Sequence, residues 1–299
     1  MSEYINFQTH AQFENLLVNA PDGAILVNTS LLADRNFTSD IVVGSDFDGT
    51  ASTFEGGQMS SWQEVKRIER GLISQAGEEK MEAGYQTWGQ DTTYEGQVAW
   101  ANDSYSIYHE EGVTRRQFEE VGRTIRLREG FIEVAGQVIK RHSGLTVVTY
   151  AMSAIVEPCL KQNGLHVAMA SNDLNSSIML YAEQSEFESD EPDAVLTKRG
   201  VKENTPRVLG ANKHEYMEQF ARLRRQDPTS IVYIGDAMVD LKAKGLGRGI
   251  LLHHRENQHY TPTSEEAFRN CEFILVGHTL SPLKGLLEDF NRPQFITVR

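Results

Sequence analysis

The stretch IVVGSDFDGTAST, residues 41–53, ends an apolar run with two acids, Asp46 and Asp48, followed by Gly49 and Thr50. Two carboxylates this close repel each other, so either a cation lies between them or one of them keeps its proton. Both conditions are typical of sites that transfer protons or bind metals, so the pair raises the question of whether the chain is an enzyme.

Other side chains that can do chemistry follow later apolar runs. Thr149 ends LTVVT, Asp236 follows SIVYIG, Asp240 lies four residues further on, and Lys213 opens the helical pattern in ANKHEYM. Ligands bind at the carboxyl ends of strands in an open parallel sheet, so we expect these residues to meet Asp46 at one edge. An oxygen-rich acid cluster suits Mg²⁺, and a cation with a hydroxyl, a lysine and helix N-termini forms a phosphate receptor.

The elements that must position these residues alternate along most of the chain. Apolar strand patterns separated by amphipathic helical patterns predict parallel βαβ units, and therefore an α/β fold with a doubly wound parallel sheet. After the first strand, helical patterns continue to about residue 128 without a strand pattern between them, which predicts a small all-helical cap domain. We predict an N-terminal extension over residues 1–40, a core domain over 41–53 and 129–299, and the cap over 54–128.

Four motifs resemble those of the haloacid dehalogenase (HAD) superfamily phosphatases. DFDGT at 46–50 matches the first, VVT ending at Thr149 the second, Lys213 the third and GDAMVD at 235–240 the fourth. The resemblance spans about residues 41–255 and implies a Rossmann-like core. A helical cap between the first and second motifs resembles the branch of phosphoserine phosphatase and pyrimidine 5′-nucleotidase. Thr149 departs from the usual Ser, and the first motif has Gly where the nucleotidase side commonly has Met.

The resemblance implies a role for each acid. Asp46 would attack the phosphorus and form an aspartyl-phosphate, and Asp48 would protonate the leaving alkoxide and then deprotonate the hydrolytic water. Mg²⁺ would be held by Asp46, by the main-chain carbonyl of Asp48 and by Asp236, while Asp240 would lie behind the metal and hold Lys213.

The phosphoryl group would be bound by uncharged and cationic residues. The resemblance implies that Gly49, Thr149 and Lys213 contact the phosphoryl oxygens and that catalysis is mostly positioning and charge neutralisation. Lys198 and Lys202 lie upstream of Lys213 and are alternatives to it.

Residues that would select the substrate stay open. Arg126 and Arg128 could meet a substrate carboxylate, as phosphoserine would require, or be solvated. Four aromatic residues could stack on a base, although aromatics at helical spacing are more often core: Trp88, Tyr94, Trp100 and Tyr105. A short run of histidines lacks partners at zinc spacing and is better explained as a solvated loop: His253, His254 and His259.

Composition limits the partners. At 299 residues with a formal net charge of −13, the chain is long enough for one large or two medium domains, and its charge argues against binding nucleic acid or anionic membranes. Without a long apolar run or an export pattern, we expect a cytoplasmic protein. Cys159 and Cys271 lack metal-ligand spacing and are expected to be reduced residues of the core. The oligomeric state does not follow from the sequence.

We predict a Mg²⁺-dependent phosphomonoester hydrolase acting on a small molecule, leaning to a nucleoside 5′-monophosphate. The alternative substrate is phosphoserine or another small phosphate. A phosphoprotein phosphatase is a further alternative, against which a cap argues because it restricts access. A catalytically silent binding protein on the same fold is the last, against which the intact motif residues argue.

Overall fold

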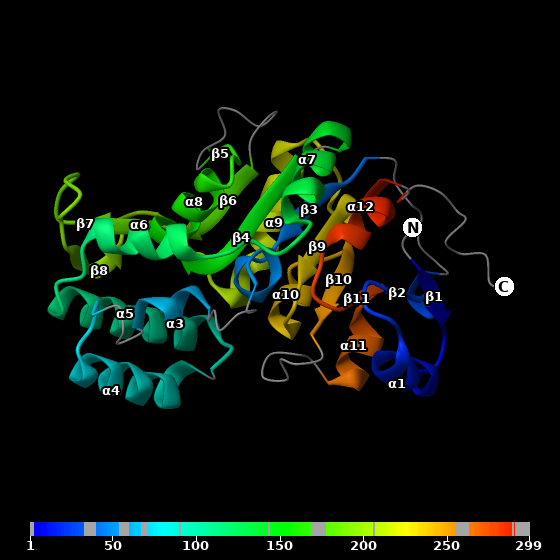
Figure 1. The fold of residues 1–299 in the computed structure, drawn as a ribbon, viewed down its shortest axis with the longest axis horizontal. Helices are drawn as coiled ribbons and strands as arrows, with labels where there is room; N and C mark the ends of the chain where they lie inside the picture. The colour runs from blue at the N-terminus through cyan, green and yellow to red at the C-terminus, as the bar shows by residue number, and fades with distance from the viewer. Residues whose placement is uncertain are drawn as a thin grey trace.

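The structure, a computed structural model, describes the chain at residues 3–32, 40–53, 60–66, 71–89, 91–142, 144–168, 178–205, 207–254, 263–288 and 290. In this part of the chain the main sheet has the order β1-β2-β11-β10-β9-β3-β4-β6-β5 (Figure 1). Neighbouring strands are parallel except for β2 and β11, which are antiparallel. The strands are β1 (Tyr4–Phe7), β2 (Ile25–Asn28), β3 (Val42–Ser45), β4 (Gly144–Met152), β5 (Val167–Ala168), β6 (Ile178–Glu183), β9 (Ile231–Gly235), β10 (Arg248–His253) and β11 (Phe273–Val276).

Helices cover both faces of this sheet. Successive side chains of a strand point to opposite faces, so Val43 packs in the cluster that contains α7 and α8, whereas Val42 packs against α9. The first face carries α7 (Phe131–Arg141), α8 (Ser153–Gln162) and α12 (Ser281–Glu288). The second carries α1 (His10–Asn19), α9 (Lys213–Leu223), α10 (Met238–Lys242) and α11 (Ser264–Asn270). The predicted α/β fold with a doubly wound sheet is confirmed.

The strand order reverses at β3, which fixes where a ligand can bind. From β3 the chain first builds outward through β4 and β6, and it later returns to form β9 on the other side of β3. The carboxyl ends of β3, β4 and β9 therefore lie side by side at a topological switch point, the usual ligand site of such sheets.

In the described part of the segment between β3 and α7, the regular elements are helices, joined by short connections. Its helices are α3 (Ser61–Lys66), α4 (Gln75–Gly84), α5 (Tyr94–Glu110) and α6 (Arg115–Thr124), and residues 85–89 continue α4 in wider turns. The chain leaves and re-enters the core side by side, since Ser52 pairs antiparallel with Leu127. The helices pack on the hairpin of β7 (Ser185–Phe187) and β8 (Leu196–Val201) (Figure 1). Residues 54–59 and 67–70 of the predicted cap lie outside the described residues.

The N-terminal segment belongs to the sheet. Its helix α1 begins after the capping residue Thr9. The two strands β1 and β2 were not predicted, and they extend the sheet beyond β11 at the end opposite to α3–α5 (Figure 1). The short helix α2 (Thr29–Leu32) follows them.

The helices are short compared with a lipid bilayer. The longest described helix, α5, has 17 residues. No helix in the described ranges combines the length and the apolar character that crossing a membrane requires.

Candidate active site

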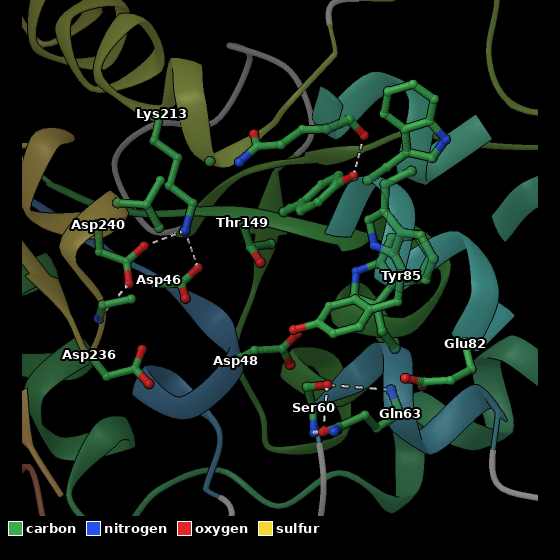
Figure 2. Close-up of a pocket in the computed structure, with 18 residues that line it drawn as sticks. Asp46, Asp48, Ser60, Gln63, Glu82, Tyr85, Thr149, Lys213, Asp236 and Asp240 are labelled. Atoms are coloured by element: carbon green, nitrogen blue, oxygen red, sulfur yellow. Dashed lines mark hydrogen bonds and ion pairs between the residues drawn. The ribbon is translucent and has the colours of Figure 1, made fainter. Parts of the chain in front are cut away.

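Asp46 comes directly after β3, at the switch point. Its main-chain N–H donates to the carbonyl of Ile234 in β9 at 3.0 Å, which fixes the start of the loop against the neighbouring strand. The loop then turns sharply through Gly49, whose φ of +74° lies in the left-handed region that favours glycine. The side chain of Asp46 is buried and faces the pocket (Figure 2).

A buried lysine joins two of the predicted acids. Lys213 Nζ, at the start of α9, lies 2.6 Å from Asp46 Oδ1 and 2.6 Å from Asp240 Oδ1 (Figure 2). Burial alone would lower the pKa of Lys213, but the carboxylates of Asp240 and Asp46 outweigh burial and raise this pKa well above its ordinary value. Lys213 is therefore charged, and it compensates part of the negative charge around Asp46.

The close approach of Asp240 to the end of β9 depends on Gly235. A Cβ atom at Gly235 would lie only 2.2 Å from the Cβ of Asp240, so a larger residue there does not fit. The Oδ2 atom of Asp240 also accepts a hydrogen bond from the Ala237 N–H at 3.1 Å. The motif GDAMVD thus folds back on itself and presents Asp240 to Lys213.

Three buried acids surround one lysine, which leaves negative charge uncompensated. Carboxylate oxygens of Asp46, Asp236 and Asp240 all lie within 4.8 Å of one another, and Thr50 Oγ1 donates to Asp236 Oδ1 at 3.0 Å. Burial, together with the charge of Asp240, raises the pKa of Asp46 to about 7 and that of Asp236 well above its ordinary value. A divalent cation would offset this repulsion, and an all-oxygen donor set suits Mg²⁺. The residues present therefore fit the metal.

Thr149 lies near the carboxyl end of β4 and lines the pocket. Its Oγ1 atom accepts a hydrogen bond from the Ala151 N–H at 3.1 Å, which fixes the side chain while the hydroxyl faces the cavity (Figure 2). Thr149 is buried, and its hydroxyl proton is available to an oxygen placed between Thr149 and Lys213.

Arg128 and His254 hold the main chain of the loop that follows β3, which carries Asp46, Asp48 and Gly49. Arg128 donates to the carbonyls of Gly49 at 2.7 Å, Thr50 at 3.0 Å and His278 at 2.9 Å, and His254 Nε2 lies 3.0 Å from the Gly49 carbonyl. Arg128 is buried beneath the loop, so a role in binding a substrate carboxylate is wrong for this residue. It instead shapes the main chain that presents Asp46 and Asp48.

The histidine run is likewise placed differently from the sequence expectation. His254 is buried against the loop rather than solvated, and burial, with the nearby charge of Arg128, lowers its pKa to about 3. His259 lies outside the described residues. Arg126 is exposed and does not line the pocket, and Gly49 does not line it either, so its contact with phosphate stays a prediction.

Asp48 points away from Lys213, towards the cap. Its Oδ1 atom accepts a hydrogen bond from the main-chain N–H of Ser61 at 2.9 Å, and its Oδ2 atom accepts one from the Ser61 hydroxyl at 2.7 Å. Burial raises the pKa of Asp48, and the two hydrogen bonds from Ser61 act in the opposite direction. Two adjacent acids thus have different surroundings, as expected for a nucleophile and a proton carrier.

The site opens into a cavity of about 370 Å³ between core and cap (Figure 2). The core contributes Asp46, Asp48, Thr149, Tyr150, Gly210, Lys213, Asp236, Ala237, Val239 and Asp240. The cap segment contributes Ser60, Trp62, Gln63, Glu82, Tyr85, Trp88, Gln97 and Trp100. The structure therefore brings together all the predicted catalytic and metal-binding side chains, and it adds a cap wall that sequence reasoning identified only in part.

Two of the four aromatic residues suggested by the sequence belong to this wall. Trp88 and Trp100 line the cavity, whereas Tyr94 is exposed outside it and Tyr105 is buried, donating from its hydroxyl to Glu183 at 3.1 Å. The missed aromatic rings have weak sequence signals: Tyr150 directly follows Thr149, but Trp62 and Tyr85 lie in helical patterns that look like core.

Other candidates lie elsewhere. Lys198 and Lys202 are exposed and do not line this cavity, which leaves Lys213 as the lysine of the site. Cys159 and Cys271 are buried and free, as expected, and burial raises the pKa of both thiols, so neither is a nucleophile.

No protein-family model matches the chain, and no curated protein matches its sequence. Solved structures do match its fold. A cytosolic 5′-nucleotidase IIIB bound to cytidine aligns with a TM-score of 0.57 and 16% identity, over 86% of this chain and 88% of that one. A phospho-aspartyl intermediate analogue of phosphoserine phosphatase aligns with a TM-score of 0.53 and 16% identity, over 84% and 99%. A HAD family hydrolase from Salmonella enterica subsp. enterica serovar Typhi aligns with a TM-score of 0.59 and 15% identity, over 85% and 73%.

The chain therefore has the fold of the HAD superfamily phosphatases, and the resemblance expected from its four motifs is confirmed at the level of the fold.

Proposed function

We propose that this protein is a Mg²⁺-dependent phosphomonoester hydrolase that acts on a small molecule through an aspartyl-phosphate on Asp46. The observation that carries the proposal is the contact of Lys213 with both Asp46 and Asp240, with Asp236 beside them at the floor of the cavity. This arrangement supplies a nucleophile, a fixed positive charge and oxygen ligands for a cation within one buried cluster.

The reaction divides between residues of the loop. In the first step a carboxylate oxygen of Asp46 bonds to the phosphorus while the bond from phosphorus to the leaving oxygen breaks, and Asp48 gives its proton to that oxygen. In the second step water attacks the phosphorus, Asp48 takes the proton, and the bond to Asp46 breaks. Lys213 and Thr149 bind phosphoryl oxygens in both steps. When bound by Asp46, Asp236 and the Asp48 carbonyl, Mg²⁺ supplies further neutralisation of phosphate charge.

The cavity wall supports a nucleoside 5′-monophosphate as the substrate. Rings of Trp88, Tyr85 and Trp100 line the cavity and offer planar apolar surfaces. Glu82, which lies near Tyr85 in Figure 2, offers a hydrogen-bond acceptor. In the described part of the lining, Lys213 is the only cationic side chain, and it is engaged by two carboxylates. A phosphoserine carboxylate would therefore lack a partner there, which favours an uncharged or cationic leaving group.

Each segment of the chain has its own role in the proposed function. In this proposal residues 41–53 and 129–299 perform the chemistry, and residues 54–128 act as the cap that selects the substrate. Residues 1–40 are an N-terminal extension whose strands β1 and β2 enlarge the core sheet. The cap residues that line the cavity also disfavour a phosphoprotein substrate, because they restrict the space above the floor.

The test is phosphate release from a panel of nucleoside monophosphates, phosphoserine, sugar phosphates and a generic aryl phosphate. We expect turnover with Mg²⁺, none with excess chelator, and the highest kcat/KM for a nucleotide. Activity that persists in chelator would overturn the metal dependence. Turnover of phosphoserine without turnover of nucleotides would overturn the substrate assignment while leaving the hydrolase intact.

A further inference from the structure

The carboxylate of Asp48 accepts hydrogen bonds from one residue of the cap. In the described part of the chain both of its hydrogen bonds come from Ser61, the first residue of α3, at 2.9 Å from the N–H and 2.7 Å from the hydroxyl. One donor meets each carboxylate oxygen, so the pair resists rotation of the carboxylate plane as well as movement of the side chain. Ser61 itself is buried, with 1% of its surface exposed.

Ser61 is held in place by its neighbour in α3. The ring of Trp62 packs against Tyr105 and Trp100 of α5, with centroid distances of 5.8 and 6.3 Å, and against Tyr150 of the core at 5.7 Å. These contacts join α3 to both the cap and the end of β4. A donor on a packed helix defines a direction better than one on an unsupported loop.

We propose that Ser61 is a positioning residue that orients the Asp48 carboxylate for proton transfer and makes this orientation depend on the docked cap. The inference rests on the proposed function, because it assigns a task to a residue that acts through Asp48. Asp48 belongs to the loop after β3 in the core, and Ser61 belongs to the cap. The two hydrogen bonds between them therefore form only when α3 lies against the core. The cap then acts on the reaction itself as well as on substrate choice.

The dependence on the leaving group provides the test. A poor leaving group, such as the alkoxide of a nucleoside monophosphate, needs the proton from Asp48, whereas the nitrophenolate of p-nitrophenyl phosphate departs without one. The value of kcat/KM reports the steps through phosphoryl transfer to Asp46. The ratio of kcat/KM for the nucleoside monophosphate to kcat/KM for p-nitrophenyl phosphate therefore isolates proton donation. A loss of active protein through misfolding cancels from this ratio, because both substrates are assayed with the same preparation.

The variants are Ser61→Ala, Ser61→Thr and the matched control Ser74→Ala. Ser74 grips Glu111 in the same way, at 2.9 Å from its N–H and 2.7 Å from its hydroxyl, in the cap but away from the cavity. We expect Ser61→Ala to lower the ratio roughly tenfold, and Ser61→Thr, which keeps the hydroxyl, to retain it within about threefold. Ser74→Ala should leave the ratio unchanged.

A double-mutant cycle completes the test. In an Asp48→Ala background, Ser61→Ala should lower the ratio no further, because the group it orients is gone. Equal losses on both substrates in Ser61→Ala, or an undiminished effect in the Asp48→Ala background, would overturn the positioning role. A wild-type protein that hydrolyses neither substrate would instead overturn the proposed function.

Discussion

The floor and the wall of the cavity differ in the charge and the burial of their residues. The floor packs Asp46, Asp236, Asp240 and Lys213 into a buried cluster at the ends of parallel strands, with contacts of 2.6 Å. The wall is formed by helices, and its residues are mainly aromatic rings and amides, with Trp88 40% exposed. The floor concentrates charge where water is excluded, and the wall offers adaptable apolar surface.

In the proposed function, this difference separates the chemistry from the selection of the substrate. Charges in a buried cluster act strongly and tolerate little displacement, so substitutions on the floor should affect all substrates alike. Aromatic contacts contribute less each and depend on the ligand, so substitutions on the wall should affect one substrate more than another. The predictions below test this separation.

The largest effect is expected for Lys213→Met. The variant leaves Asp46 and Asp240 without their shared cation, so kcat should fall by about 10³-fold or more for every substrate. Lys202→Met, which removes an exposed lysine outside the cavity, is the matched control and should stay within about twofold. Steady-state phosphate release measures both. A folded Lys213→Met protein with near wild-type turnover would show that the floor does not act as described.

A smaller loss is expected for Thr149→Val, which keeps the shape of the side chain and removes the hydroxyl. Loss of one hydrogen bond to a phosphoryl oxygen should reduce kcat/KM by about 10- to 100-fold on aryl and nucleotide substrates alike. Thr149→Ser keeps the hydroxyl and should remain within about threefold. If Val and Ser behaved equally, the hydroxyl of Thr149 would have no part in binding phosphate.

On the wall, Trp88→Ala should discriminate between substrates. Loss of a ring that stacks on a base should cost about 1 kcal/mol, or roughly fivefold in kcat/KM for a nucleoside monophosphate. The generic aryl phosphate should change little, and Tyr94→Ala, an exposed aromatic outside the cavity, should change neither. Equal losses of kcat/KM for both substrates in Trp88→Ala would contradict the separate roles of wall and floor.

Behind the floor, His254 should affect stability more than catalysis. Its folded pKa of about 3 lies below its ordinary value, so the unfolded chain binds a proton that the folded chain does not between these pH values. Acidification through this window therefore destabilises the folded protein, by about 1.4 kcal/mol per pH unit at most. In urea unfolding at pH 7 and 4.5, His254→Gln should lose less stability on acidification than the wild type, with exposed His166→Gln as the control. Equal losses in the wild type and His254→Gln would contradict this.

The floor was predictable from the sequence because strand ends and motif spacing determine it. Asp46, Thr149 and Asp236 each follow an apolar run, and parallel strands bring their carboxyl ends together whatever the loops do. Lys213 was predictable only through the resemblance, since Lys198 and Lys202 have the same chemistry and only the packing of α9 distinguishes them.

The wall was not predictable to the same degree. A helical pattern identifies α3–α6 but not which aromatic side of each helix faces a ligand, so Tyr105 and Trp100 look alike in sequence. The strands β1 and β2 are short, and the pairing of β2 with β11 joins distant parts of the sequence without a local pattern. The hydrogen bonds of Arg128 and Ser61 to the loop after β3 likewise join residues that are separated in the sequence, by 78 positions for Arg128 and Thr50 and by 13 for Ser61 and Asp48.

The central claim, that Asp46 is the nucleophile, is tested most directly by chemical trapping. The wild-type protein is mixed with substrate and Mg²⁺, quenched during turnover and treated with borohydride, which reduces an aspartyl-phosphate to homoserine. Peptide mass analysis should then find homoserine at position 46, only when substrate and Mg²⁺ are both present, and Asp46→Asn should release no phosphate. An unmodified Asp46 in a protein that is turning over, or trapping at another residue, would contradict the claim.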